Sequence, residues 1–165
     1  MVHIRSFQPE DALAVAGLIL PIQQSEFGIP ITLEAQPDLL NIQGFYQRNR
    51  GNFWVGVAGG RVIGTVGLLG IGNGQAALRK MFVAAAYRGK QHGVAQRLLE
   101  QLVVWCRDKA ITSVYLGTTA KFLAAHRFYE KNGFGEIEQS TLPETFPIMA
   151  VDTKFYKLEI KRNPA

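Results

Sequence analysis

The chain has 165 residues, of which 47% are hydrophobic and 19% are charged, and its formal net charge is +5 at pH 7. These proportions are those of an ordinary globular protein and exclude the collagen-like and intrinsically disordered classes. A chain of this length buries roughly two thirds of the surface that it exposes when unfolded. We therefore expect a single domain over residues 1–165 that holds its core without disulfides.

The cysteine content and the N-terminal residues indicate a reducing compartment. Cys106 is the only cysteine, lies in the apolar run LLEQLVVWC and is expected to be a buried thiol and not a nucleophile. Residues 1–20 lack the basic start, apolar stretch and cleavage site of a secretory leader. No window reaches the roughly 18 apolar residues of a membrane span. The sequence therefore predicts a cytoplasmic protein with no membrane partner.

The basic residues are concentrated in one part of the sequence. Those between residues 79 and 97 have no acidic residue among them: Arg79, Lys80, Arg88, Lys90 and Arg97. A local basic site suits a compact polyanion. It does not suit a long duplex, because the chain has neither basic runs interleaved with aromatic residues nor Cys/His finger spacing. No nucleic-acid partner is expected, and a nucleic-acid-binding module is the least favoured function.

The first fifty residues predict a strand and two helices. VHIRSF is typical of a strand, and Pro9, followed by Glu10 and Asp11, is typical of a helix start. Three prolines and a glycine interrupt residues 21–38, so this segment is expected to be irregular and to form a lid or pocket wall. Apolar residues at helical spacing then predict a short helix over residues 39–48.

The remaining sequence alternates strand and helix patterns. Gly59 and Gly60 divide a stretch rich in β-branched and aromatic residues, and they suit the positive φ angles of a tight hairpin. A broad apolar face predicts a helix from Val94 to Cys106, and Gly133 is suited to cap a second helix. The expected elements after the first fifty residues are strands within 53–69, a turn over 70–74, a strand over 76–83, a helix over 94–106, a strand over 113–119, a helix over 120–132, and strands over 134–140 and 150–160.

The segment YRGKQHGVAQRLLEQL, which opens the strongest helix, is typical of an anion-binding loop. The first turn of a helix has unpaired N–H groups and partial positive charge, and both favour phosphate oxygens. Gly89 and Gly93 allow close approach of a ligand to the backbone. Val94 and Ala95 stand where an NTPase loop has lysine and a hydroxyl, which disfavours nucleotide hydrolysis. A diphosphate such as that of coenzyme A remains, and the alternative is a solvated helix N-terminus.

Two motifs extend this interpretation. The strand LRKMFV followed by RGKQHGVAQRLL contains Lys90, Gly93 and Ala95 in a pattern of Gln or Arg, two residues, Gly, one residue, then Gly or Ala. The second motif, YLGTTAKFLAAHRFYEKNGF, contains Tyr129 and ends in Gly133 and Phe134. On these motifs the chain resembles the GNAT superfamily of acyl-coenzyme-A N-acyltransferases over nearly its whole length.

The resemblance implies an α+β fold, a three-layer αβα sandwich with a mixed, mostly antiparallel sheet of six to seven strands and about four helices. It also implies acetyl-CoA as co-substrate, with no metal, bound between two splayed strands and at the loop. The cofactor-binding residues would be Met81, Phe82, Val83, Arg88, Gly89, Lys90, Gln91, His92, Gly93, Val94 and Ala95. Two departures are that Lys90 replaces the usual Gln or Arg, and that Phe122 replaces an asparagine that contacts the pantetheine arm.

The same resemblance implies an N-acetyltransferase in which the amine attacks the thioester directly and Tyr129 is the general acid to the leaving thiolate. A core aromatic residue is the alternative for Tyr129. Alkylamines are mostly protonated at pH 7, so a base or a water relay is needed. The strand before Val83 carries no carboxylate, which leaves Glu26, Glu34 and Asp38, and we expect Glu26 to be the base. An ordinary solvated carboxylate is the alternative for each.

The acceptor is expected to be a small-molecule or peptide amine, and the local acidity of the first fifty residues favours a cationic one. Phe27, Glu34, Asp38 and His126 are the expected substrate-binding residues. Phe146, Met149 and Phe155 are expected either in the opposite wall of the pocket or in a buried last strand, and the sequence explains both equally well. A monomer or homodimer is expected. The competing function is a non-catalytic acyl-coenzyme-A-binding domain that regulates a partner.

Overall fold

The structure is a computed structural model that describes residues 1–161. One sheet runs through it, with the strand order β1-β2-β3-β4-β5-β7-β6. Neighbouring strands are antiparallel except β4 and β5, which are parallel. In chain order the strands are β1 (Val2–Ser6), β2 (Asn52–Ala58), β3 (Arg61–Gly72), β4 (Gln75–Val83), β5 (Ser113–Thr118), β6 (Gly135–Ile137) and β7 (Lys154–Glu159).

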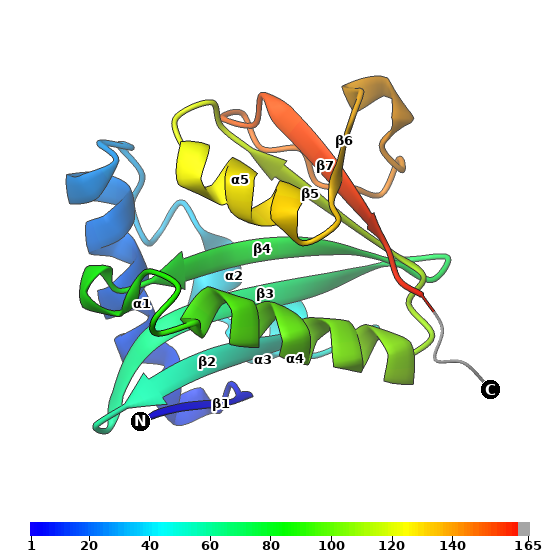
Figure 1. The fold of residues 1–165 in the computed structure, drawn as a ribbon. Coiled ribbons are helices and arrows are strands. Elements are labelled where there is room, and N and C mark those ends of the chain that lie inside the picture. Colours follow the sequence, from blue (N-terminus) through cyan, green and yellow to red (C-terminus); the bar gives the residue numbers. More distant parts are fainter. Residues whose placement is uncertain (162–165) are drawn as a thin grey trace.

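Helices cover both faces of the sheet. In Figure 1, α4 and α5 lie in front of the sheet, and α1, α2 and α3 lie behind it. The helices are α1 (Ala12–Pro21), α2 (Pro37–Leu40), α3 (Ile42–Tyr46), α4 (Val94–Asp108) and α5 (Leu123–Lys131), with short turns η1 (Pro9–Asp11), η2 (Ile22–Glu26), η3 (Ala85–Tyr87) and η4 (Gln139–Thr141). The predicted α+β fold, with three layers and a mixed seven-stranded sheet, is therefore confirmed; residues 1–161 contain one α-helix more than expected.

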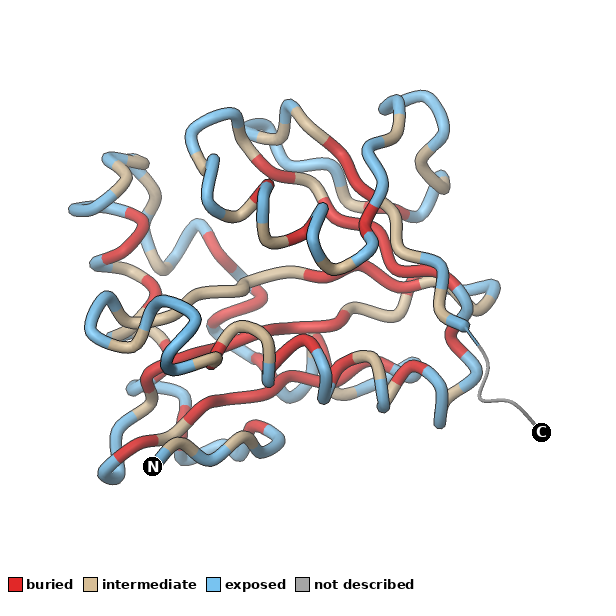
Figure 2. The backbone as a smooth tube through the Cα atoms, viewed as in Figure 1, coloured by how far each residue is buried: buried red, intermediate tan, exposed pale blue. Residues whose placement is uncertain are grey.

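Apolar side chains fill the space on each side of the sheet, and Figure 2 shows the buried positions concentrated along the strands. On the α4 side, Leu98 and Leu102 pack in one cluster with Val66 of β3 and Val114 of β5. A second cluster joins α1 and α3 to β2 on the other face. Cys106 is a buried thiol in the first cluster, as predicted, and burial raises its pKa to about 12. The strongest helical pattern in the sequence thus forms the main helix of one core.

The segment after Pro21 is more helical than predicted. Pro21 lies within the last turn of α1, and the chain continues into the wider π-helical turn η2. Here the Phe27 amide donates to the carbonyl oxygen of Ile22 at 3.1 Å, five residues back. The helix predicted over residues 39–48 is divided at Asn41, whose side chain accepts a hydrogen bond from the Gly44 amide. The irregular structure predicted from the proline pattern was therefore wrong for residues 22–26.

The parallel pair β4 and β5 creates the opening that positions the site. Their paired residues are Gln75–Ala77 of β4 against Ser113–Tyr115 of β5. Beyond these pairs the two strands diverge, with β5 followed by α5 and β4 followed by η3 (Figure 1). The backbone edge of β4 that faces β5 is consequently open from Leu78 to Val83.

Candidate active site

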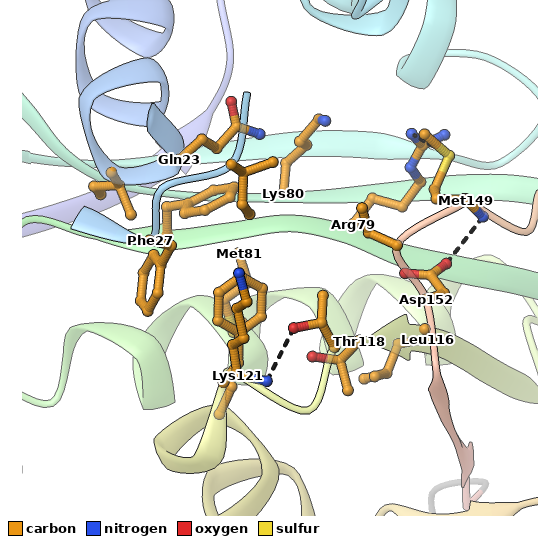
Figure 3. Close-up of a pocket in the computed structure, with 18 of the residues that line it drawn as sticks. Gln23, Phe27, Arg79, Lys80, Met81, Leu116, Thr118, Lys121, Met149 and Asp152 are labelled. Atoms are coloured by element: carbon orange, nitrogen blue, oxygen red, sulfur yellow. Dashed lines mark hydrogen bonds between the residues drawn. The ribbon is translucent and has the colours of Figure 1, made fainter. Parts of the chain in front are cut away.

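A cavity of about 580 Å³ lies where β4 and β5 separate. Most of its walls come from four parts of the chain: η2 and the loop after it, the second half of β4, the end of β5 with the start of α5, and residues 146–152; Arg88, from the loop before α4, also lines it. Figure 3 shows side chains from all four, among them Phe27, Lys80, Thr118 and Asp152, around the cavity. Segments far apart in the sequence therefore share one site.

A bulge in β4 sets the direction of its side chains in the cavity. Lys80 has a φ of 55°, and the pairing of β3 with β4 is irregular at this point. The hydroxyl of Thr65 donates to the carbonyl oxygen of Lys80 at 2.8 Å. Adjacent side chains of a regular strand point to opposite faces. The bulge therefore lets Arg79 and Lys80 approach the same carboxylate, that of Asp38.

Met81, Phe82 and Val83 all line the cavity from the last part of β4. Since the pairing with β5 ends at Ala77, their backbone groups are open on that side. An extended chain with amide groups, such as a pantetheine arm, can pair with an open strand edge of this kind. The structure thus places all three residues at the separation of β4 and β5.

The loop before α4 presents backbone amides at a helix start. Gly89 and Gly93 have positive φ angles of 103° and 60°, and Gly93 is the N-cap of α4. The first amides of α4 have no acceptor within the helix, and the helix dipole adds positive charge there. The other predicted residues of the loop are either exposed or in the first turn of α4: Lys90, Gln91, His92, Val94 and Ala95. This geometry suits a diphosphate.

Arg88 joins this loop to η2. Its Nε donates to the carbonyl oxygen of Val83 at 2.8 Å, and its two terminal nitrogens donate to the two carboxylate oxygens of Glu26. The hydrogen bonds from Arg88 hold the pKa of Glu26 below its usual range. Both residues line the cavity. Glu26 is therefore an ion-pair partner at the site, which makes it a weaker proton acceptor than a free carboxylate.

Tyr129 lines the cavity from α5 and is 7% exposed. Its ring packs edge-on against Phe134, with a centroid distance of 5.5 Å. Burial raises the pKa of its hydroxyl well above the ordinary value, so the hydroxyl keeps its proton over the whole working range of pH. No residue in the described part of the chain forms a hydrogen bond with that hydroxyl. The cavity therefore contains a protonated, unpaired donor.

Of the predicted substrate-binding residues, only Phe27 reaches the cavity. Its ring lies edge-on to that of Phe122, with 4.5 Å between centroids, and Phe122 also lines the cavity. Glu34 is exposed and outside the cavity. His126 is buried, and its Nε2 donates to the carbonyl oxygen of Thr119 at 2.8 Å. Asp38 is buried outside the lining and accepts a 2.6 Å hydrogen bond from the Tyr46 hydroxyl.

Four charged residues of the cavity were not predicted as site residues: Arg79, Lys80, Lys121 and Asp152. The adjacent cations on the strand expected to hold the cofactor were a signal, but the bulge that turns them to one side has no sequence pattern. Asp152 lies in the closing segment, of which Phe146 and Met149 line the cavity as expected and Phe155 does not.

Two further features of residues 1–161 concern metal-ligand groups and membrane-spanning helices. No three or more His, Cys, Asp or Glu side chains are grouped there in a way that could hold a metal ion. No helix in this part of the chain combines the length and apolar character that crossing a bilayer requires.

Comparison with known proteins identifies relatives in sequence and in fold. The chain is 37% identical over 111 residues to N-acetylaspartate synthetase from Danio rerio, a match that covers 64% of this chain but 39% of that protein. A GNAT-family acetyltransferase from Staphylococcus aureus Mu50 superposes with a TM-score of 0.93 at 36% identity, covering 98% of this chain and 100% of the other.

A more distant structure shares the fold alone. The PaiA N-acetyltransferase of Thermoplasma acidophilum, solved in complex with coenzyme A, is 16% identical, with a TM-score of 0.73 and coverage of 96% and 99% of the two chains. The model of the acetyltransferase (GNAT) family matches residues 19–134, which is more than half of the chain. Given this match, the cavity between β4 and β5 and the loop before α4, the chain belongs to the acetyltransferase (GNAT) family.

Proposed function

We propose that this protein transfers an acetyl group from acetyl-CoA to an amine by direct attack of the amine on the thioester. Family membership supports the class of reaction. The open edge of β4 and the amides at the start of α4 support the choice of co-substrate, because they match an amide-containing arm that ends in a diphosphate.

The cofactor-binding residues divide into two groups in this proposal. Met81, Phe82 and Val83 pair with the pantetheine arm through their backbone, and the loop from Arg88 to Ala95 holds the diphosphate. Phe122, which stands where relatives have an asparagine, contributes an apolar wall in place of a polar contact. Arg88 already donates hydrogen bonds to Val83 and Glu26, so its main effect on the diphosphate is through its charge.

Tyr129 is the general acid, and its unpaired hydroxyl in the cavity is the observation that carries the proposal. When the nitrogen–carbon bond forms, the carbon–sulfur bond breaks and the thiolate needs a proton. A tyrosine whose pKa is raised by burial is fully protonated at neutral pH and can supply it. Breaking the C–S bond without this proton would leave a thiolate in an apolar cavity, which is unfavourable.

Replacing Tyr129 with phenylalanine tests the proposal. We expect Tyr129→Phe to lower kcat by about 10²- to 10⁴-fold and to leave the affinity for acetyl-CoA nearly unchanged, because only the transition-state proton donor is lost. The assay is amine-dependent release of the coenzyme A thiol.

Tyr115→Phe is the matched control, because Tyr115, on β5, is also a buried tyrosine but does not line the cavity. It should retain wild-type kcat. The competing function, a regulatory acyl-coenzyme-A-binding domain, predicts tight cofactor binding, no amine-dependent thiol release and no difference between the two variants. That result would remove the enzymatic proposal.

A further inference from the structure

Two buried cations at the inner end of the cavity share one carboxylate. Arg79 Nη2 and Lys80 Nζ lie 3.8 and 3.6 Å from Asp38 Oδ2, and the side chains of the two cations are 14% and 10% exposed. The Tyr46 hydroxyl also donates to this oxygen. Burial lowers the pKa of Lys80 in spite of the nearby carboxylate. Lys80 Nζ also donates to the side-chain oxygen of Gln36 at 2.7 Å, and this acceptor is neutral.

The guanidinium of Arg79 has spare donors on the cavity side. Its one side-chain hydrogen bond within residues 1–161 goes to the sulfur of Met149, at 3.8 Å, and sulfur is a weak acceptor. The group also lies 5.6 Å from the ring centre of Phe45, which fixes its position. Arginine has five N–H donors in a planar fork that matches a carboxylate. Arg79 is consequently poised to bind a carboxylate that the protein does not provide.

A carboxylate that makes no direct ion pair with these cations faces the same space. Asp152 Oδ2 accepts one hydrogen bond, from the Met149 amide at 3.0 Å, and no ion pair to Asp152 exists in the described chain. The group lies against the backbone of β5, since a Cβ at Gly117 would come within 2.5 Å of Oδ2. Figure 3 shows Asp152 and Arg79 near each other in the cavity. Burial raises the pKa of Asp152, which suits a proton acceptor.

The other charged residues of the lining lie apart from this group: Glu26 and Arg88 pair with each other, and Lys121 is exposed just before α5. Asp152 acts on Arg79 and Lys80 through space, but the described chain forms no ion pair between Asp152 and either cation. The inner end of the cavity thus presents two cations on β4 and a carboxylate near β5 that are not in direct contact. That arrangement complements a molecule with a carboxylate and an ammonium group close together.

We infer that the acceptor amine carries a carboxylate of its own, as an amino acid does, and that Arg79 with Lys80 binds that carboxylate while Asp152 receives the proton of the ammonium group. The inference rests on the proposed function and names its acceptor. It differs from the cationic acceptor expected from the acidity of the first fifty residues, because Glu34 and Asp38 do not line the cavity and Glu26, which does, is paired with Arg88.

The proton and bond changes balance. The ammonium loses one proton to Asp152, which passes it to solvent. The neutral nitrogen then forms a bond to the acetyl carbon as the carbon–sulfur bond breaks. Tyr129 gives its proton to the departing sulfur and recovers one from the nitrogen of the new amide. The products are the N-acetyl acceptor, the coenzyme A thiol and one released proton.

A panel of matched acceptors tests the inference. Each α-amino acid is compared with its amide, which keeps the amine and side chain but lacks the negative charge, and polyamines and short peptides are included. The readout is the thiol release that each compound causes. We expect the best amino acid to exceed its amide by at least tenfold in kcat/KM, as loss of a charged hydrogen-bonded partner implies.

Substitution of Arg79 assigns the preference to this residue. Arg79→Gln should lower kcat/KM for the best amino acid at least tenfold and leave its amide within about threefold, whereas Arg79→Lys, which keeps the charge, should restore part of the loss. Arg61→Gln, at an exposed position of the β2–β3 hairpin, is the matched control. Thermal melting of each variant shows that a loss is not due to unfolding.

Asp152→Asn gives a separate readout. In the wild-type protein kcat/KM should fall at low pH as Asp152 takes up a proton. The Asp152→Asn variant should lose most of the activity, and its remaining kcat/KM should no longer fall at low pH. Preference for amides, peptides or polyamines over free amino acids would overturn the inference and leave the acetyltransferase proposal intact. Failure of every amine to release thiol from a protein that binds acetyl-CoA would overturn both.

Discussion

The Glu26 carboxylate can act as the ion-pair partner of Arg88 or as a general base, and the two roles predict effects of different size. The side chains are 38% exposed for Arg88 and 37% for Glu26, and such surface pairs contribute about 0.2–1 kcal/mol. A general base, by contrast, accelerates a reaction about 10²- to 10⁴-fold. We expect Glu26→Gln to keep kcat within about twofold, and a double-mutant cycle with Arg88→Gln in urea to give a coupling below about 1 kcal/mol.

Glu34→Gln is the control for this cycle, because Glu34 is an exposed carboxylate that does not line the cavity. It should change neither kcat nor the free energy of unfolding. A hundredfold fall in kcat for Glu26→Gln alone would instead assign the base to Glu26, as the sequence analysis expected.

At the level of single residues, the sequence predicted best where a residue type has a local requirement. Gly89, Gly93 and Gly133 all have positive φ angles, which glycine adopts at little cost. The part of the cavity proposed to bind the acceptor, around Arg79 and Lys80, was not predictable in the same way. Arg79 and Lys80 are neighbours in a strand pattern that places them on opposite faces, and the bulge between them depends on tertiary contacts.

The bulge in β4 sets the directions of the Arg79 and Lys80 side chains, which are proposed to bind the acceptor. Thr65 is fully buried, and its hydroxyl donates to the carbonyl oxygen of Lys80, the bulged residue. Thr65→Val keeps the shape but leaves that carbonyl without its donor, and it should lower the free energy of unfolding by about 1–3 kcal/mol. Because Arg79 and Lys80 lose their support, kcat/KM for the acceptor should fall more than the affinity for acetyl-CoA.

Chemical denaturation and steady-state kinetics together measure both effects. Thr112→Val is the control, since the Thr112 hydroxyl also donates to a carbonyl oxygen, that of Gly74, but in an exposed turn. It should leave the acceptor kinetics unchanged. Wild-type stability and acceptor kinetics in Thr65→Val would show that the bulge does not depend on this hydrogen bond.

At the scale of the molecule, hydrophobic periodicity and turn residues predicted the order of the strands and helices well. The hairpin at Gly59 and Gly60 and the helix α4 follow from local patterns that tertiary contacts reinforce. The divergence of β4 from β5 has no pattern of its own, and only the family resemblance indicated it. The continuation of the helix past Pro21 was missed because proline usually ends a helix, whereas here Pro21 lies in the last turn of α1 and the chain continues into the π-helical turn η2.

The two halves of the sheet are joined by few backbone pairs, so a ligand between them should stabilise the whole fold. Strands β1–β4 meet β5–β7 through the short register of Gln75–Ala77 with Ser113–Tyr115. Coenzyme A at about 100 times its Kd should raise the free energy of unfolding by about 2.7 kcal/mol. For a chain of this size that corresponds to a rise in Tm of about 5–11 °C, measured by calorimetry.

A pair of glycine variants shows whether the loop before α4 causes that rise. An added Cβ has open space at both Gly89 and Gly135, but only Gly89 has a positive φ, of 103°. Gly89→Ala must therefore move the loop backbone, and a tenfold loss of affinity would halve the stabilisation at the same ligand concentration, to about 1.4 kcal/mol. Gly135→Ala should keep the full rise in Tm. An equal rise in both variants would place the coenzyme A site away from this loop, because the affinity of a ligand held there depends on the direction of the loop amides. No rise in the wild-type protein would show that coenzyme A does not bind the folded chain.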